Sequence, residues 1–276
     1  MSEETPSLRR ILVALDASPH SRAALDAAVR LAAAFEAEVE GLFVEDETLL
    51  RASQLPFAEE VRSYTVPPKR LSDDRMQRQL RHQAKYAEHA LRQTAEREEV
   101  PYDFRTVKGD VTRELLRAAA EVDLLVLGKT STESSRRRLG STCRTLLADA
   151  SSPVLVLRRP VPPQKPLLLY YDGSVPAEAA LALATRLVRH GSAPTLDVLL
   201  PAHDEAEADR LDEQVRARPD VPLRVHRLTR AEGRRLSAFA RKDGGLVILP
   251  SCCPSLEDTS LKQFLYEMDR PLLVVR

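Results

Sequence analysis

The stretch ILVALDASPHSRAALDAAVRLAA, residues 11–33, changes its hydrophobic period within a few positions. Its first five residues form a short aliphatic run, which is typical of a strand buried on both faces. Asp16 and Ser18 follow, and such side chains commonly begin a helix. From Ser21 to Phe35 the small and aliphatic residues fall on one helical stripe: Ala24, Leu25, Ala28, Leu31 and Ala32. The stretch therefore predicts a strand, a polar turn and a helix.

The same plan recurs at residues 167–189, LLLYYDGSVPAEAALALATRLVR, with Asp172 and Ser174 at the positions of Asp16 and Ser18. The tails match as well, because LLVLG at 124–128 corresponds to LVILP at 246–250. Between the copies lies RRPVPPQKP, residues 158–166, whose four prolines indicate a stiff linker. The repeat predicts two domains, 1–159 and 160–276.

Strand and helix patterns alternate through the first copy, which predicts βαβ units and a parallel sheet covered on both faces. We expect further strands at 39–44, 104–107, 124–127 and 154–157, helices at 74–98, 112–120 and 141–150, and an irregular excursion at 45–73. The fold class is α/β, with two tandem five-stranded Rossmann-like domains. Because 154–157 and 272–275 end their copies as short aliphatic strands, we expect them to pair and to form an intramolecular pseudo-dimer.

Composition excludes several classes of protein. Lys plus Arg equals Asp plus Glu at 41 each, so net charge does not favour nucleic acid as a partner. The N-terminal residues lack an apolar signal core, and no run approaches the ~18–20 apolar residues of a membrane span. The three cysteines do not form a disulfide framework. We expect a cytoplasmic protein without a membrane partner.

The segment LLVLGKTSTESSRRRLGST, residues 124–142, is the candidate phosphate loop. Gly140, Ser141 and Thr142 begin a helix, and free N–H groups at a helix start suit an anion. Asp16, Val44 and Gly128 fall at the ends of predicted strands, where open parallel sheets bind their ligands. A P-loop is excluded, since Asp123 occupies the position of its first glycine.

Three segments carry a resemblance to the universal stress protein family in its tandem form: ILVALDASPHS, VKGDVTRELLRAAAEVDLLVLG and LGSTCRTLLADASSPVLVL. The resemblance implies a five-stranded parallel α/β sandwich. Family members that bind ATP or a related nucleotide are marked by Gly-x2-Gly-x9-Gly-Ser/Thr. Here Gly128, Gly140 and Ser141 match, Ser131 replaces the second glycine, and eight residues instead of nine precede Gly140.

The resemblance also implies a nucleotide site, with ATP or another adenine nucleotide and Mg²⁺ as the ligand. Asp16 would face the ribose or adenine, Val44 would offer its backbone to the adenine, and the glycine loop would line the phosphates. The implied site residues are Ala14, Leu15, Asp16, Val44, Leu127, Gly128, Lys129, Ser131, Gly140, Ser141 and Thr142.

Several of these residues have a second interpretation. Lys129 either contacts phosphate or is solvated, and the arginines at 136–138 contact phosphate, are solvated or contact a partner. Asp16 faces a ligand, caps the following helix, or does both. In the second copy Pro250 replaces Gly128, and no glycine follows it. Glu257 and Asp258 would repel phosphates there, so we expect the second copy not to bind ATP.

No Ser-His-Asp set, metal site or general base is evident, so the leading hypothesis is a non-enzymatic stress-response protein. It would bind an adenine nucleotide in its first domain, with a structural second domain. The alternatives are a nucleotide-free module that acts through an unknown protein partner and the charged excursion at 45–98, and a slow ATPase. An adenylyl-transfer or other ATP-using enzyme of similar topology would want His-x-Gly-His or Ser-Gly-Gly-x-Asp-Ser after the first strand, where this chain has DAS. Association into a homodimer is also compatible with the resemblance.

Overall fold

The computed structural model describes residues 8–16, 18–55, 59–60, 69–70, 73–128, 140–157, 165–202, 204–217, 220–228, 245–251 and 270–276. The first half of the chain contains β1 (Arg10–Ala14), α1 (Pro19–Phe35), β2 (Glu38–Asp46), α2 (Glu47–Ser53), β3 (Glu59–Glu60), β4 (Lys69–Arg70), α3 (Asp73–Arg97), β5 (Tyr102–Gly109), α4 (Val111–Ala119), β6 (Leu124–Gly128), α5 (Ser141–Asp149) and β7 (Val154–Leu157). The second half contains β8 (Leu167–Tyr170), α6 (Val175–Arg189), β9 (Leu196–Pro201), α7 (Glu205–Arg216), β10 (Leu223–Leu228), β11 (Val247–Pro250) and β12 (Leu272–Val275).

Ten of the strands form one sheet in the order β10-β9-β8-β11-β12-β7-β6-β1-β2-β5. Within each half all neighbours are parallel, and the two halves have the same strand order. Parallel neighbours require crossover connections, which the helices supply. The predicted α/β class with two five-stranded parallel halves is confirmed.

The halves meet at an antiparallel pair of strands, β7 and β12. Leu155 lies opposite Leu273, and both side chains are buried. Each strand would be an unpaired apolar edge in an isolated half, so the pairing satisfies both edges at once. The predicted pairing of the two last strands is thus confirmed. The boundary between residues 159 and 160 lies outside the described residues and stays a prediction.

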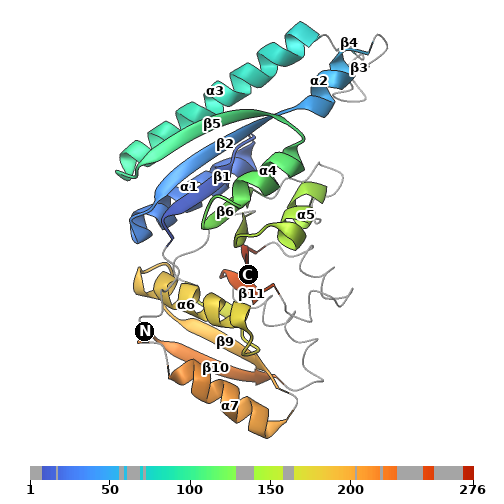
Figure 1. Cartoon of the computed structure of the whole chain (residues 1–276). Coiled ribbons are helices and arrows are strands. Elements are labelled where there is room, and N and C mark those ends of the chain that lie inside the picture. Colours follow the sequence, from blue (N-terminus) through green and yellow to red (C-terminus); the bar gives the residue numbers. More distant parts are fainter. Residues whose placement is uncertain are drawn as a thin grey trace.

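Residues alternate along the strands between two cores, as the period of a strand requires. Ile11 and Val13 of β1 join a core that runs across both halves beneath α1, α3, α6 and α7. Leu12 faces the opposite side, where α4 and α5 cover the first half. Figure 1 shows α3 lying along β2 and β5 and reaching past the sheet toward α2.

Helix α5 connects the two halves. Leu147 packs against the second half's own cluster, which includes Leu168 and Val274. Arg276 Nη2 donates a hydrogen bond to the Leu147 carbonyl at 2.8 Å. Burial lowers the pKa of Arg276, and the nearby Asp149 carboxylate partly offsets this. The second half therefore holds the C-terminal end of the helix whose other end is the predicted phosphate site.

The expectation of an irregular segment over residues 45–73 is wrong for its first part. Strand β2 continues to Asp46, and α2 follows directly. The Asp46 carboxylate accepts a hydrogen bond from the Thr48 N–H at 2.7 Å, which caps the helix, and Arg51 pairs with Glu47 one turn away at 2.9 Å. Strands β3 and β4 pair antiparallel further on. The remaining residues of this segment, 56–58, 61–68 and 71–72, lie outside the described residues.

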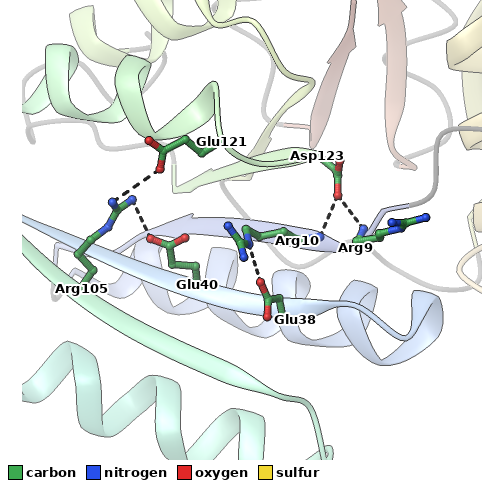
Figure 2. A network of polar contacts seen from close by, with 7 residues as sticks. All are labelled: Arg9, Arg10, Glu38, Glu40, Arg105, Glu121 and Asp123. Atoms are coloured by element: carbon green, nitrogen blue, oxygen red, sulfur yellow. Dashed lines mark hydrogen bonds and ion pairs between the residues drawn. The ribbon is translucent and has the colours of Figure 1, made fainter.

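The edge of the sheet at which β1, β2 and β6 begin carries a charged network (Figure 2). The backbone N–H groups of Arg9 and Arg10 donate to Asp123 Oδ2 at 2.7 and 2.9 Å. The Arg10 side chain meets Glu38 at 2.5 Å. Arg105 of β5 meets Glu40 at 2.8 Å and Glu121 at 3.8 Å. These groups satisfy the polar ends of the strands, while the opposite edge remains for a ligand.

In the part of the chain that the structure describes, no helix has the length and apolar character that crossing a membrane would demand.

Candidate nucleotide site

A cavity of about 320 Å³ lies where β1, β2 and β6 end. Small-molecule sites range from roughly 300 to 1,000 Å³. Seven of the residues implied by the family resemblance line it: Ala14, Leu15, Asp16, Val44, Leu127, Gly128 and Thr142. Ten further residues complete the lining: Ser21, Leu42, Phe43, Asp46, Leu49, Leu80, Gln83, Val111, Leu115 and Cys143. The topology thus brings distant sequence segments to one hollow.

Val44 has backbone groups that no strand in the described part of the chain satisfies on one side. β1 pairs with β2 only as far as Ala14 opposite Leu42, and a last bond runs from the Leu15 N–H to the Leu42 carbonyl at 2.9 Å. In a parallel ladder, residues two apart point their backbone groups to the same neighbour. Val44 therefore directs one N–H and one C=O past the end of β1, on the side of the cavity.

Asp16 supports the start of α1 without capping it. Its Oδ1 accepts a hydrogen bond from the Ser18 N–H at 3.0 Å. Ser18 is the cap, because its hydroxyl oxygen accepts from the Ser21 N–H at 3.2 Å. Asp172 and Ser174 repeat the arrangement in the second half. The interpretation of Asp16 as the cap is therefore wrong, and its exposed carboxylate borders the cavity.

Helix α5 presents a free N-terminus at the same edge. Gly140 occupies the cap position, and no side chain caps the helix there. The first N–H groups of a helix have no partner within it, so they are available to an anion. The Thr112 hydroxyl donates to the Thr142 hydroxyl at 3.2 Å, which leaves the Thr142 proton for another acceptor. Gly140 and Ser141 directly precede Thr142 but do not line the cavity itself.

Gly128 has a packing reason to be glycine. A Cβ built there would lie 2.6 Å from the carbonyl carbon and oxygen of His20 and 2.8 Å from the Ser21 nitrogen. These are backbone atoms of the first turn of α1, and they cannot rotate away. Close contact between a strand end and a helix start is one known use of glycine in nucleotide-binding βα units. Gly128 is thus required by the fold, whether or not a phosphate lies beside it.

The described wall of the cavity carries two carboxylates, from Asp16 and Asp46, and no lysine or arginine. Lys129 and Ser131 lie outside the described residues, as do the arginines at 136–138. Asp16 supplies an oxygen of the kind that Mg²⁺ prefers when it also binds phosphate. Across the same described ranges, no cluster of three His, Cys, Asp or Glu side chains could hold a metal ion by itself. This part of the cavity suits the uncharged base and sugar of a nucleotide.

The outer wall of the cavity was not anticipated. Leu49 comes from α2, and Leu80 and Gln83 come from α3. Leu80 belongs to the buried stripe of α3, so helical periodicity could have placed it on the inner face of the helix. No sequence pattern predicts that α3 reaches this edge of the sheet.

The second half differs from the first at the corresponding positions. It has α7 where the first half has α2 and α3. Tyr171 occupies the position of Leu15, is buried and donates a hydrogen bond to Glu178. Pro250 ends β11 where Gly128 ends β6, and Glu257 and Asp258 lie outside the described residues.

A second cavity, of about 340 Å³, lies between the halves and is slightly larger. It is lined mainly by leucines and alanines, among them Leu124, Leu155 and Leu273. Leu124 and Leu167 begin their strands, so this cavity lies toward the strand starts. It has neither a free helix N-terminus nor a carboxylate at a strand end among its described lining residues. We therefore place the functional site at the smaller cavity.

Comparison with known proteins agrees with the fold. A family model described as the universal stress protein family matches residues 7–158. A universal stress protein from Archaeoglobus fulgidus is similar over 96% of this chain and 97% of its own, with 17% identity and a TM-score of 0.71. A functionally unknown protein from Pseudomonas aeruginosa is similar over 99% of this chain and 94% of its own, with 14% identity and a TM-score of 0.63. A universal stress protein solved in complex with cAMP is similar over 55% of this chain and 98% of its own, with 21% identity. Its TM-score of 0.40 is too low to support an argument about this chain. A search of curated protein sequences returned no match.

Proposed function

Because the chain belongs to the universal stress protein family, we propose that its first half binds ATP or another adenine nucleotide and that its second half has a structural role. The observation that carries the proposal is that three polar features with spare hydrogen-bonding capacity lie at or beside one cavity. These are the backbone groups of Val44, the carboxylate of Asp16 and the N-terminus of α5. The first suits a base edge, the second a ribose hydroxyl and the third a phosphate.

The second half stabilises this site without sharing it. Its strand β12 pairs with β7, and Arg276 bonds to the carbonyl of Leu147 in α5. An anchored helix loses little further freedom when a phosphate binds at its start, which favours affinity. Binding without a defined reaction is the function that this arrangement supports best, since its polar features suit recognition of a base, a sugar and a phosphate.

Calorimetry with ATP, ADP and AMP tests the proposal. The wild-type protein should bind with one site per chain. Asp16→Asn should weaken binding by roughly tenfold or more, because a hydrogen bond to a charged group contributes about 1.5–3 kcal/mol. Asp172→Asn is the matched control, since Asp172 makes the same turn contact in the second half. Absence of binding heat for all three nucleotides would contradict the proposal.

A second candidate function is a protein-interaction module built on α2 and α3. Leu49, Leu55 and Tyr86 are large apolar side chains with 47%, 46% and 52% of their surface exposed. Loops and added helices beside a site frequently carry partner surfaces. Native mass spectrometry of the purified protein separates the candidates. A bound nucleotide would raise the measured mass above that of the polypeptide, whereas a nucleotide-free interaction module would show the polypeptide mass alone.

A further inference from the structure

One polar side chain on the outer wall of the cavity has no partner. Gln83 follows Leu80 by three residues on α3, and both line the cavity. The Gln83 side chain is half-buried, and it makes no hydrogen bond with any of the described residues. Its neighbours on this wall, Leu49 and Leu80, are apolar. Neither amide atom is among the fully buried polar atoms, so both are open to the cavity and available to a group that fills it.

The rest of the cavity favours a partly apolar group. Leu42 and Leu127 come from the sheet, and Leu115 comes from α4. Val44 offers one backbone donor and one acceptor from the end of β2. A group that fills this space therefore needs apolar faces and an edge with both donors and acceptors. A purine base has both properties.

We propose that Gln83 selects adenine over guanine, an inference that rests on the nucleotide-binding function proposed above. The Gln83 amide nitrogen donates to adenine N7, and its amide oxygen accepts from the exocyclic N6 amine. Glutamine matches this adenine edge in a bidentate manner, whereas guanine presents two acceptors, N7 and O6. The second N6 hydrogen and N1 remain for the carbonyl and N–H of Val44. With guanine, Gln83 Oε1 would face O6, and two acceptors repel.

Calorimetry with ATP, GTP and 7-deaza-ATP, which lacks the N7 acceptor, tests this assignment. The wild-type protein should bind ATP about three- to tenfold more tightly than 7-deaza-ATP, the value of one hydrogen bond, and should bind GTP more weakly still. Gln83→Ala should bind ATP and 7-deaza-ATP equally and should lose only part of its preference over GTP, because the Val44 backbone still matches N6 and N1 of adenine and mismatches O6 and N1–H of guanine. Gln83→Leu should behave in the same way, because it keeps the volume of the side chain and removes only the polar atoms.

Gln79→Ala is the matched control, since Gln79 is exposed on the same helix one turn earlier and does not line the cavity. It should leave all three affinities unchanged. If the wild type binds ATP but both Gln83 variants keep the wild-type ratio of ATP to 7-deaza-ATP affinity, Gln83 does not read the base and this inference alone is overturned. If the wild type binds none of the three nucleotides, the proposed function fails, and this inference fails with it.

Discussion

Replacement of Gly128 by alanine separates the two reasons for a glycine at this position. The added Cβ would lie 2.6 Å from the His20 carbonyl carbon and oxygen, whereas ordinary contact begins at 3.4 Å. The end of β6 or the first turn of α1 must therefore move by several tenths of an ångström. That turn is held by the Ser18 cap, so the shift weakens the cap as well.

Overpacking of this kind costs about 1–3 kcal/mol. We expect Gly128→Ala to lower the free energy of unfolding by this amount with no nucleotide present. Urea titration followed by circular dichroism measures the loss as a lower midpoint at an unchanged m-value. A loss that appeared only in nucleotide affinity would show instead that the glycine serves the ligand.

Gly109→Ala is the control for this prediction. The three atoms nearest to its new Cβ all belong to the Glu114 side chain, the closest at 2.9 Å, and a side chain can adjust where backbone cannot. We expect a change within about 0.5 kcal/mol. Equal stability of Gly128→Ala and Gly109→Ala would refute the packing argument.

Three further predictions follow from the interface, the helix start and a charged cluster. A protease site introduced between residues 160 and 164 and then cleaved should leave the halves associated in gel filtration, because β7 and β12 stay paired; two separate monomers would contradict this. Gly140→Val should abolish nucleotide binding by blocking approach to the α5 N-terminus. The Gly140 backbone, with φ −60° and ψ 160°, does not require glycine, so circular dichroism should show the wild-type helix content. Burial raises the pKa of Asp212, but hydrogen bonds from Arg227 and Arg216 outweigh it and leave the pKa below its ordinary value. The stability that this lowered pKa contributes is present above pH ~4 and is lost as the pH falls through the lowered pKa. The melting temperatures of the wild type and Asp212→Asn should therefore differ at pH 7 and become equal at low pH.

Periodicity and the internal repeat were sufficient to predict the sheet. The aliphatic runs at 11–15 and 154–157 are buried strands, and their burial on both faces is what made them recognisable. Helix α2 was missed because it is a single short segment of seven residues, without an apolar stripe long enough to detect. Its cap, Asp46, was a readable signal, but it was overlooked because the strand before it continues beyond Val44.

The candidate site was predictable only where the strands themselves place it. Asp16 follows β1, Val44 lies near the end of β2 and Gly128 ends β6, and adjacent parallel strands bring their ends together. Gln83 could not be found in this way, since its position depends on the angle at which α3 crosses the sheet. The packing role of Gly128 was equally hidden, because it depends on the distance between β6 and the first turn of α1.

Photolabelling with 2-azido-ATP, followed by mass spectrometry of tryptic peptides, tests most directly the claim that the first half binds an adenine nucleotide and the second half does not. The base of a bound nucleotide should lie beside Val44, so the label should appear in the peptide of residues 31–51 and disappear when excess ATP is added. No ATP-sensitive label should appear beyond residue 165, because the second half has Pro250 and Tyr171 where the first has Gly128 and Leu15. Labelling of the second half, or labelling of the first half that ATP does not prevent, would contradict the account.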